Sequence, residues 1–277
     1  MIDLHLHTNA SDGTYSPGDL VGRAAGAGLT VIAVTDHDTT AATRDVRGHA
    51  HERGIEAISG IEITAVEGDR DVHVLAYFLD PAELSLVEFL ARQRATRLAR
   101  VEAIAARLAS LGMPVDVQPL VDDVRRQGLR SLGRPEIARA MIAAGHVADT
   151  REAFDKWLGR DAPAFVPRPG APVEAVIAII HRAGGLASLA HPGRTGIDDR
   201  IPALRDRGLD ALEVYHTDHD DGLRDRYRRL AHGLGLLVTG GSDYHGDPAY
   251  GLTPGAATLP VNDWRRLEAA RHRHVSR

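Results

Sequence analysis

The chain has 277 residues, of which 43% are hydrophobic and 26% are charged, and it contains no cysteine. Disulfides and thiolate metal sites are therefore excluded, so any metal ion would have to be held by His, Asp and Glu. The net charge of −5 argues against binding to duplex DNA, which needs a basic surface. In the sequence we recognise neither the pattern of a signal peptide nor an apolar run long enough to cross a bilayer. We therefore expect a cytoplasmic protein without a membrane partner.

The first predicted element is a strand over residues 2–7, in which apolar and polar residues alternate. Since successive side chains of a strand point to opposite faces, Asp3, His5 and His7 share one face. Two imidazoles spaced about 7 Å apart in this way could hold a metal ion. The same pattern is typical of the solvent-facing side of an edge strand, so the pair by itself decides nothing.

The next elements alternate between helix and strand. Ser16 and Pro17 mark the start of a helix, and Gly28 marks its end. The predicted order continues with a strand over residues 29–38, a helix over 40–54, and strands over 55–64 and 72–80. Alternation of this kind predicts parallel βαβ units.

From residue 81 onward the pattern changes to helices alone. A long helix is predicted over residues 83–111, and shorter helical segments follow up to about residue 167. The alternation then returns and ends in a short strand near residues 255–260. We predict an α/β barrel over residues 1–80 and 169–262, an all-α insertion over 81–168 and a C-terminal tail over 263–277. The insertion leaves the barrel after the strand that carries His73 and returns before the strand that carries His191. We therefore expect it to cover the barrel rim as a lid.

Histidines and acidic residues gather in the predicted strands or directly after them. In parallel α/β barrels the C-terminal strand ends form one rim, so residues far apart along the chain would converge there. The candidate ligands are His5, His7, Asp12, His37, Glu62, His73, His191, Asp243 and His245. They are too many for one tetrahedral zinc ion, but they suit two or three divalent ions with Glu62 as a bridge. Without metal, so many buried polar groups would be costly.

The motifs DLHLHTNASDG, TDHD, GIEIT, DVHVLAYFLD, LAHPG and GSDYHG occur in this order along the chain. Together they resemble the motifs of the PHP (polymerase and histidinol phosphatase) family. The resemblance implies a distorted (β/α)7 barrel that binds two or three metal ions. It implies a first metal set of His5, His7, Glu62 and Asp243, a second of Glu62, His73 and His191, and a third of Asp12, His37 and His245. Asp12 stands where some relatives have His, and Asp is an adequate ligand.

Mixed oxygen and nitrogen ligands without thiolate favour manganese or iron over zinc alone, and we expect manganese. Closely spaced ions of this kind suit phosphoester hydrolysis, with a metal-bound hydroxide as the nucleophile. We therefore expect His37, Glu62 and Asp243 to be catalytic. Whether His37 or a metal-bound water protonates the leaving oxygen stays open. Asp36 and Asp38 could orient His37, although for Asp38 we favour a role as the cap of the following helix.

A phosphorylated substrate also needs positive partners beyond the metal ions. Arg134 opens a helix of the insertion and Arg194 directly follows a ligand-bearing strand, so both could bind phosphate. In an Arg-rich chain, each could equally be a solvated surface charge. His216 lies near the rim and is a further candidate for substrate contact.

The insertion, with the stretches GRPEIARAM and AFDKWLGRDAPAFVPR, resembles the stand-alone PHP group that includes a 3′,5′-nucleoside bisphosphate phosphatase and an RNase that trims 5′ ends. This resemblance implies a small phosphorylated nucleotide as substrate, which loses its 3′-phosphate to leave a 5′-mononucleotide and free phosphate. In that group a His is usual where this chain has Glu136, whose carboxylate would repel phosphate. The alternatives are a 5′→3′ exoribonuclease on short RNA, a histidinol-phosphate phosphatase and a non-catalytic metal-binding accessory module.

Overall fold

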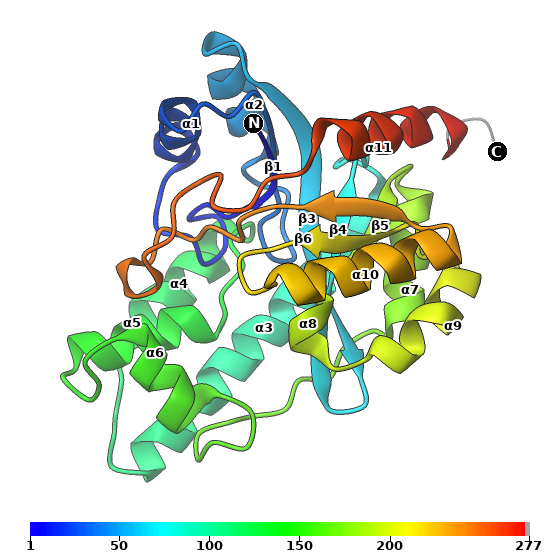
Figure 1. The fold of residues 1–277 in the computed structure, drawn as a ribbon. Coiled ribbons are helices and arrows are strands. Elements are labelled where there is room, and N and C mark those ends of the chain that lie inside the picture. Colours follow the sequence, from blue (N-terminus) through cyan, green and yellow to red (C-terminus); the bar gives the residue numbers. More distant parts are fainter. Residues whose placement is uncertain (275–277) are drawn as a thin grey trace.

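A computed structural model describes residues 1–274, apart from the side chains of Gln127 and of residues 272–274. Within this range seven strands form one sheet, in the order in which they occur along the chain (Figure 1). The strands are β1 (Ile2–Leu6), β2 (Val31–Val34), β3 (Glu56–Glu67), β4 (Arg70–Tyr77), β5 (Leu186–Leu189), β6 (Ala211–Tyr215) and β7 (Leu237–Gly240). The sheet nearly closes on itself, because the His7 backbone N–H after β1 donates to the Tyr244 carbonyl oxygen after β7 at 3.0 Å. This is the predicted α/β barrel.

One strand runs against the predicted direction. β4 pairs antiparallel with β3 and with β5, whereas the other paired strands are parallel. β3 and β4 are longer at this end than predicted, so that Gly68 and Asp69 alone separate them. Two residues suffice for an antiparallel hairpin, while a parallel connection needs a dozen or more. The prediction of parallel strands is therefore wrong for β4. Its N-terminal half lies beside the C-terminal half of β3.

Helices cover the outside of the barrel. They are α1 (Pro17–Gly26), α2 (Thr43–Glu52), α7 (Val173–Arg182), α9 (Ile201–Asp206), α10 (Asp221–Leu234) and α11 (Val261–His274), with the short α8 (Pro192–Thr195). Residues 263–274, predicted to be part of a tail, belong to α11, because Trp264 and Leu267 share one face and are buried in the barrel's core. The predicted strand near residues 255–260 does not form. There the chain is held by the Leu259 N–H, which donates to the Ile2 carbonyl oxygen at 2.9 Å.

β1 is buried on both faces, so its polar residues do not form the solvent-facing side of an edge strand. Leu4 packs in the core, while Asp3 and His5 are equally inaccessible to solvent. Asp3 accepts hydrogen bonds from the Ser242 N–H at 2.9 Å, the Ser242 hydroxyl at 2.6 Å and the Gly255 N–H at 2.8 Å. The carboxylate therefore joins the first strand to the loops after the last one.

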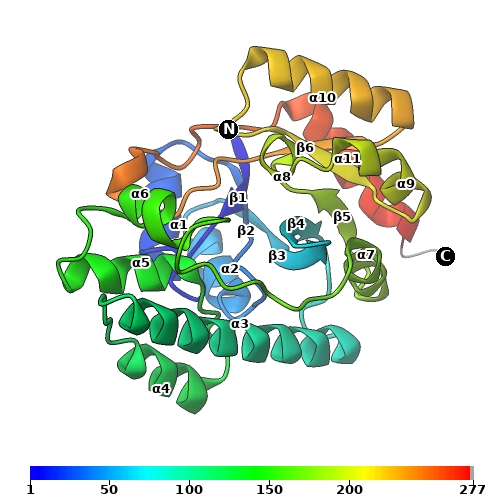
Figure 2. The same ribbon diagram turned by 90° about the horizontal axis from the view of Figure 1, so that it is seen from below.

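The insertion contains α3 (Leu84–Ser110), α4 (Gln118–Gln127), α5 (Arg134–Ala143) and α6 (Thr150–Ala153), and a π-helical turn over Phe154–Leu158 follows α6. These helices share an apolar core of their own, which includes Val101, Ile137 and Met141. Figures 1 and 2 show them grouped on one side of the barrel. The Ser131 N–H donates to the Ala10 carbonyl oxygen at 2.9 Å, which ties the insertion to the loop after β1. Among the described residues, no helix has both the length and the apolar character needed to cross a membrane.

Candidate active site

The structure brings all nine predicted ligands together at one end of the barrel. His5 and Glu62 lie within β1 and β3, and His37 and His191 follow β2 and β5. His73 pairs with Thr64 in the N-terminal half of β4, which reaches this end because the strand is reversed. The loops after β1 and β7 carry the remaining four, which are His7, Asp12, Asp243 and His245.

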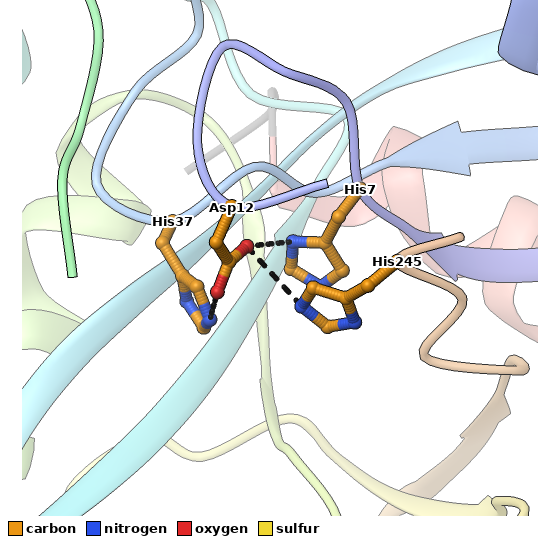
Figure 3. A group of neighbouring side chains, drawn as sticks. All are labelled: His7, Asp12, His37 and His245. Atoms are coloured by element: carbon orange, nitrogen blue, oxygen red, sulfur yellow. Dashed lines mark ion pairs between the residues drawn. The ribbon is translucent and has the colours of Figure 1, made fainter. Parts of the chain in front are cut away.

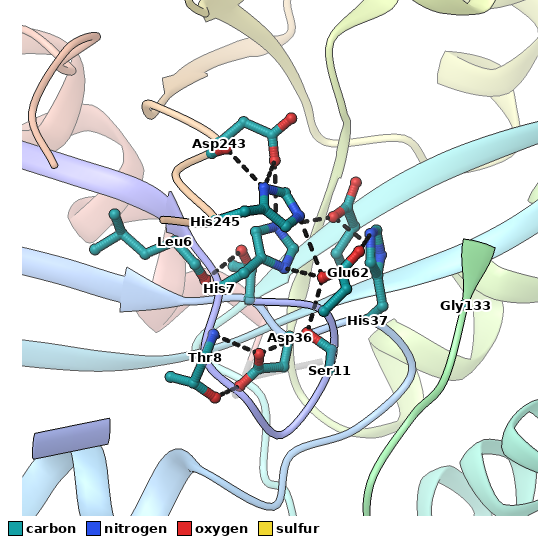
Figure 4. Close-up of polar contacts among 12 residues, drawn as sticks. Leu6, His7, Thr8, Ser11, Asp36, His37, Glu62, Gly133, Asp243 and His245 are labelled. Atoms are coloured by element: carbon teal, nitrogen blue, oxygen red, sulfur yellow. Dashed lines mark hydrogen bonds and ion pairs between the residues drawn. The ribbon is translucent and has the colours of Figure 1, made fainter. Parts of the chain in front are cut away.

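Glu62 lies at the centre of this cluster and is fully buried (Figure 4). Its Oε2 atom is 3.2 Å from His5 Nε2, 3.3 Å from His7 Nε2 and 3.2 Å from His37 Nδ1. Its Oε1 atom is 2.8 Å from His73 Nδ1 and 3.2 Å from His191 Nε2. One carboxylate thus faces five imidazoles from four separate segments, an arrangement that suits a bridging ligand.

Two further carboxylates complete the cluster. The Oδ1 atom of Asp243 is 3.2 Å from both His5 Nε2 and His7 Nε2. Asp12 lies between His37 on one side and His7 and His245 on the other, as Figure 3 shows. Its Oδ2 atom is 3.4 Å from His37 Nε2, and its Oδ1 atom is 3.2 Å from His245 Nε2.

The cluster fits divalent metal ions. Several buried ring nitrogens form no hydrogen bond with a described residue, namely both nitrogens of His7 and the Nδ1 atoms of His37, His73 and His191. Most of them face carboxylate oxygens at close range, yet without hydrogen-bond geometry. Buried polar atoms left unpaired cost about 1–3 kcal/mol each. Bound cations would remove this cost by accepting the nitrogen and oxygen lone pairs together.

The ligand atoms fall into overlapping groups within 4.8 Å of one another. His5, His7, Glu62 and Asp243 form one group, with the same members as the first expected set. A second group holds the third expected set together with His7, and a third combines His37, Glu62 and His73. The groups share residues, so ions bound in them would be close neighbours. The number and identity of the ions remain predictions.

In the metal-free cluster, the surroundings raise the pKa of one histidine and lower the pKa of two others. Burial alone would lower the pKa of His7, but the carboxylates of Asp243 and Glu62 raise it to about 10. Burial lowers the pKa of His37 to about 3 and that of His191 to about 4. His37 is therefore neutral at neutral pH in the metal-free cluster, the protonation state in which an imidazole can bind metal. A proton on His7 takes the place that a cation would occupy.

Acidification should weaken metal binding, because the imidazole ligands must lose their protons before they coordinate. The raised pKa of His7 means that protons compete for this ligand even at neutral pH. We expect the apparent dissociation constant for Mn²⁺ to rise at least ~10-fold between pH 7.5 and pH 6, and activity lost in acid to return partly with added metal. Chelator competition across this pH range measures the effect. If the loss of activity at low pH is the same at every metal concentration, the prediction is contradicted.

The two aspartates beside His37 do not contact its ring. Asp36 accepts hydrogen bonds from the Thr8 N–H at 2.7 Å and the Thr8 hydroxyl at 2.6 Å, so it fixes the loop that follows His7 (Figure 4). The expectation that Asp38 caps the next helix is also wrong, because α2 begins only at Thr43. The Asp38 carboxylate is instead buried against arginines of the insertion.

The contacts of Asp38 show what the insertion contributes. Asp38 pairs with Arg97 of α3 at 2.5 Å and with Arg168 at 3.2 Å, and it accepts the Thr64 N–H at 2.9 Å. The sequence analysis missed Arg97, Arg100 and Arg168, all of which line the cavity beside the metal cluster. Repeated arginines on the inward face of the long helix were the available signal.

Glu213 was also missed. It is fully buried in β6 and its Oε1 atom lies 2.9 Å from His5 Nδ1. Its signal in the sequence is a lone carboxylate within the apolar strand ALEVY.

A cavity of about 740 Å³ opens above the cluster, between the barrel rim and the insertion. Its lining includes Arg134 and Arg194, the two predicted phosphate contacts. His216, predicted to touch substrate, does not line it. This side chain is fully buried. Its Nδ1 atom accepts the Asp218 N–H at 3.0 Å, and its Nε2 atom faces Asp243 Oδ2 at 3.4 Å.

Glu136 is likewise not among the residues that line the cavity. It is 2% exposed, and its carboxylate accepts the Gly133 N–H at 2.9 Å and pairs with Arg139 at 2.9 Å. The carboxylate therefore caps the N-terminus of α5. The pairing with Arg139 offsets the charge of this residue, and the expected repulsion of phosphate stays a prediction.

Known proteins resemble this chain over nearly its full length. The sequence model of the family described as "PHP domain" matches residues 3–108 of this chain. A 3′,5′-nucleoside bisphosphate phosphatase of Chromobacterium violaceum is 32% identical over 97% of this chain and 96% of its own. The chain is a member of the PHP domain family. The 5′-3′ exoribonuclease Rnm of Salmonella typhimurium is 33% identical over 88% of this chain and 84% of its own.

Solved structures agree with this membership of the PHP family. A candidate metal-dependent phosphoesterase from Bifidobacterium adolescentis has a TM-score of 0.89 and 34% identity, covering 98% of this chain and 96% of its own. The family, the barrel and the histidine-rich rim together make this PHP protein a metal-dependent phosphoesterase.

Proposed function

We propose that this PHP protein hydrolyses the 3′-phosphate of nucleoside 3′,5′-bisphosphates to give 5′-mononucleotides. Two or three divalent ions, with manganese favoured, would polarise phosphoryl oxygens, activate water and stabilise the attacking and leaving oxygens when bound. The chain supplies the ligands for them, with Glu62 shared between sets and Asp243 facing His5 and His7. The insertion supplies the part of the site that distinguishes one phosphate ester from another.

The observation that carries the proposal is a cluster of arginines in the cavity wall. Asp38 is shared by Arg97 and Arg168, and Asp71 is shared by Arg100 and Arg134. Within the described residues, these four guanidinium groups thus pair with two carboxylates. Burial and the nearby charge of Arg100 lower the pKa of Arg134 to about 10, so its cation lacks full compensation.

The same wall has unused hydrogen-bond donors. Nη2 of Arg100 and Nε of Arg168 are buried and have no hydrogen-bond partner among the described residues. A phosphate carries a charge of about −1.5 to −2 and three acceptor oxygens. A second phosphate, beyond the one at the metal cluster, would satisfy both the charge and the donors. A nucleotide phosphorylated at both ends of its ribose has that second phosphate, and the Chromobacterium relative is named for such a substrate.

The second candidate is a 5′→3′ exoribonuclease on short RNA, which the name of the Salmonella relative favours. Binding along a strand relies on aromatic side chains that stack on successive bases. Phe154 and Tyr250 are the aromatic residues that line the cavity within the described chain. This lining suits one nucleotide better than an extended strand.

The test compares adenosine 3′,5′-bisphosphate, histidinol phosphate and a short 5′-phosphorylated RNA by kcat/KM under the same metal conditions. We expect the bisphosphate to be the best substrate, with adenosine 5′-monophosphate as the product. A clear preference for either of the others would overturn the proposal. No activity on any of the three with metal fully bound would favour an accessory module.

Replacing Arg134 with Ala should raise KM for the bisphosphate about 10–100-fold, because a hydrogen bond to a charged group contributes about 1.5–3 kcal/mol. KM for a simple aryl phosphate should change little, since that substrate has no second phosphate. Steady-state kinetics on both substrates measure the difference. Arg125→Ala is the matched control, because Arg125 is exposed on α4 and pairs with Glu102. An equal rise in KM for both substrates would contradict the assignment.

A further inference from the structure

Glu213 connects two predicted metal ligands that come from different parts of the chain. Its side chain has no solvent exposure, and it lies between Leu212 and Val214 in β6. Its Oε1 atom lies 2.9 Å from His5 Nδ1, and its Oε2 atom accepts the backbone N–H of His191 at 2.7 Å. Glu213 does not line the cavity, so it touches no substrate.

The first contact determines which nitrogen of His5 can bind metal. When Nδ1 carries the proton and donates it to Glu213, the lone pair of the neutral ring is at Nε2. That Nε2 atom is 3.2 Å from both Glu62 and Asp243, at the centre of the cluster. Glu213 thus selects the tautomer and holds the ring with its free lone pair toward the metal site.

The second contact holds a strained backbone. His191 has a φ of 28°, which residues other than glycine rarely adopt. Such a conformation persists only where its surroundings enforce it. The carboxylate of Glu213 does so by accepting the His191 N–H, while the side chain of His191 reaches Glu62 Oε1 at 3.2 Å. Without that acceptor the residue could relax and withdraw its imidazole from the cluster.

We infer that Glu213 is a positioning residue for metal binding, which fixes the tautomer of His5 and the backbone of His191. His5 belongs to the first expected metal set and His191 to the second. One buried carboxylate therefore prepares both sets, and its loss weakens both at once. The inference rests on the metal dependence of the proposed function, but not on the choice of substrate.

The test is the affinity of Glu213→Gln for Mn²⁺, measured by chelator competition and without any substrate. Gln keeps the shape, but its amide nitrogen must face either the His5 Nδ1–H or the His191 N–H, both of which are donors. We expect the variant to bind Mn²⁺ about 10–100-fold more weakly than the unchanged chain. The number of sites at saturation should stay the same, since Glu213 orients ligands and is not one itself.

Ser59→Ala is the matched control. Ser59 is also buried, and its hydroxyl donates a hydrogen bond to the Leu79 carbonyl oxygen at 2.7 Å, but neither residue is among the predicted ligands. We expect this variant to lose thermal stability while its Mn²⁺ affinity stays within about threefold of the unchanged chain. Equal losses of affinity in the two variants would overturn the inference, because general loosening would then explain both. So would a Glu213→Gln chain with unchanged affinity, or one that lacks exactly one ion at saturation.

A second measurement needs no variant at Glu213. In the Zn²⁺-loaded chain, ¹H–¹⁵N correlations of the histidine rings, assigned with a His5→Asn sample, should show His5 protonated at Nδ1. Protonation at Nε2 would overturn the inference even if Glu213→Gln failed to fold. A chain that takes up no divalent ion at all would overturn the metal-dependent function itself, and this inference with it.

Discussion

Replacing Glu62 with Gln should lower kcat at least ~100-fold, because this residue loses a charged ligand atom that no neighbour can supply. Its two oxygens face five imidazoles, and the residue is fully buried at the centre of the cluster. Gln keeps the volume of the side chain, so the barrel should still fold. Steady-state kinetics with saturating Mn²⁺, together with metal analysis of the same samples, measure the effect. The unchanged chain should hold more than one ion, and the variant fewer.

Glu52→Gln provides the matched control for this substitution. Glu52 lies at the end of α2 with a 66% exposed side chain, and its ion pairs with His49 and Arg53 are at the surface. Exposed pairs of this kind contribute at most about 1 kcal/mol. Turnover and metal content should therefore match the unchanged chain. A Glu62→Gln variant with near-normal turnover and all its metal would show that Glu62 is not a bridging ligand.

Replacing Asp38 with Asn should destabilise the metal-free chain by about 3–5 kcal/mol, the usual cost of removing one partner from a buried ion pair. Asn can still accept the Thr64 N–H, but it leaves the charges of Arg97 and Arg168 without their carboxylate. The free energy of unfolding from urea titrations measures the loss. Activity should fall as well, because both arginines line the cavity.

The same carboxylate should also make stability depend on pH. Burial alone would raise the pKa of Asp38, but the charges of Arg97 and Arg168 hold it well below its usual value. A depressed pKa in the folded state stabilises the chain above the unfolded pKa of about 3.9, and this contribution is lost as the pH falls toward the folded value. The Asn variant should therefore lose stability less steeply in acid.

Asp206→Asn is the corresponding surface control, since Asp206 is 73% exposed and pairs with its neighbour Arg205. Its free energy of unfolding should change by less than about 1 kcal/mol. An equally small change in Asp38→Asn would mean that Asp38 does not compensate the buried arginines.

The sequence alone was sufficient to find the residues that gather at the barrel rim. Each motif is local: His5 and His7 are two residues apart at the end of one strand, while Glu62 and His191 lie in or directly after others. Parallel strand ends meet at one rim, so order along the chain was enough to predict that these side chains converge. His73 converged for a different reason, because the short turn at Gly68 reverses its strand. Local spacing fixed the identity of these residues but not the direction of that strand.

The partners of the supporting residues were decided only by the tertiary structure. Asp38 pairs with Arg97 and Arg168, which are 59 and 130 residues away, and Glu213 meets His5 across 208 residues. From the local sequence, a carboxylate directly before a helix is expected to cap that helix. In Asp38, the ion pairs with distant arginines override this local preference. No repeating pattern along the chain records such contacts. They arise because closing the barrel and folding the insertion against it bury these charges, and a buried charge is retained only where a partner of opposite sign or a hydrogen bond meets it.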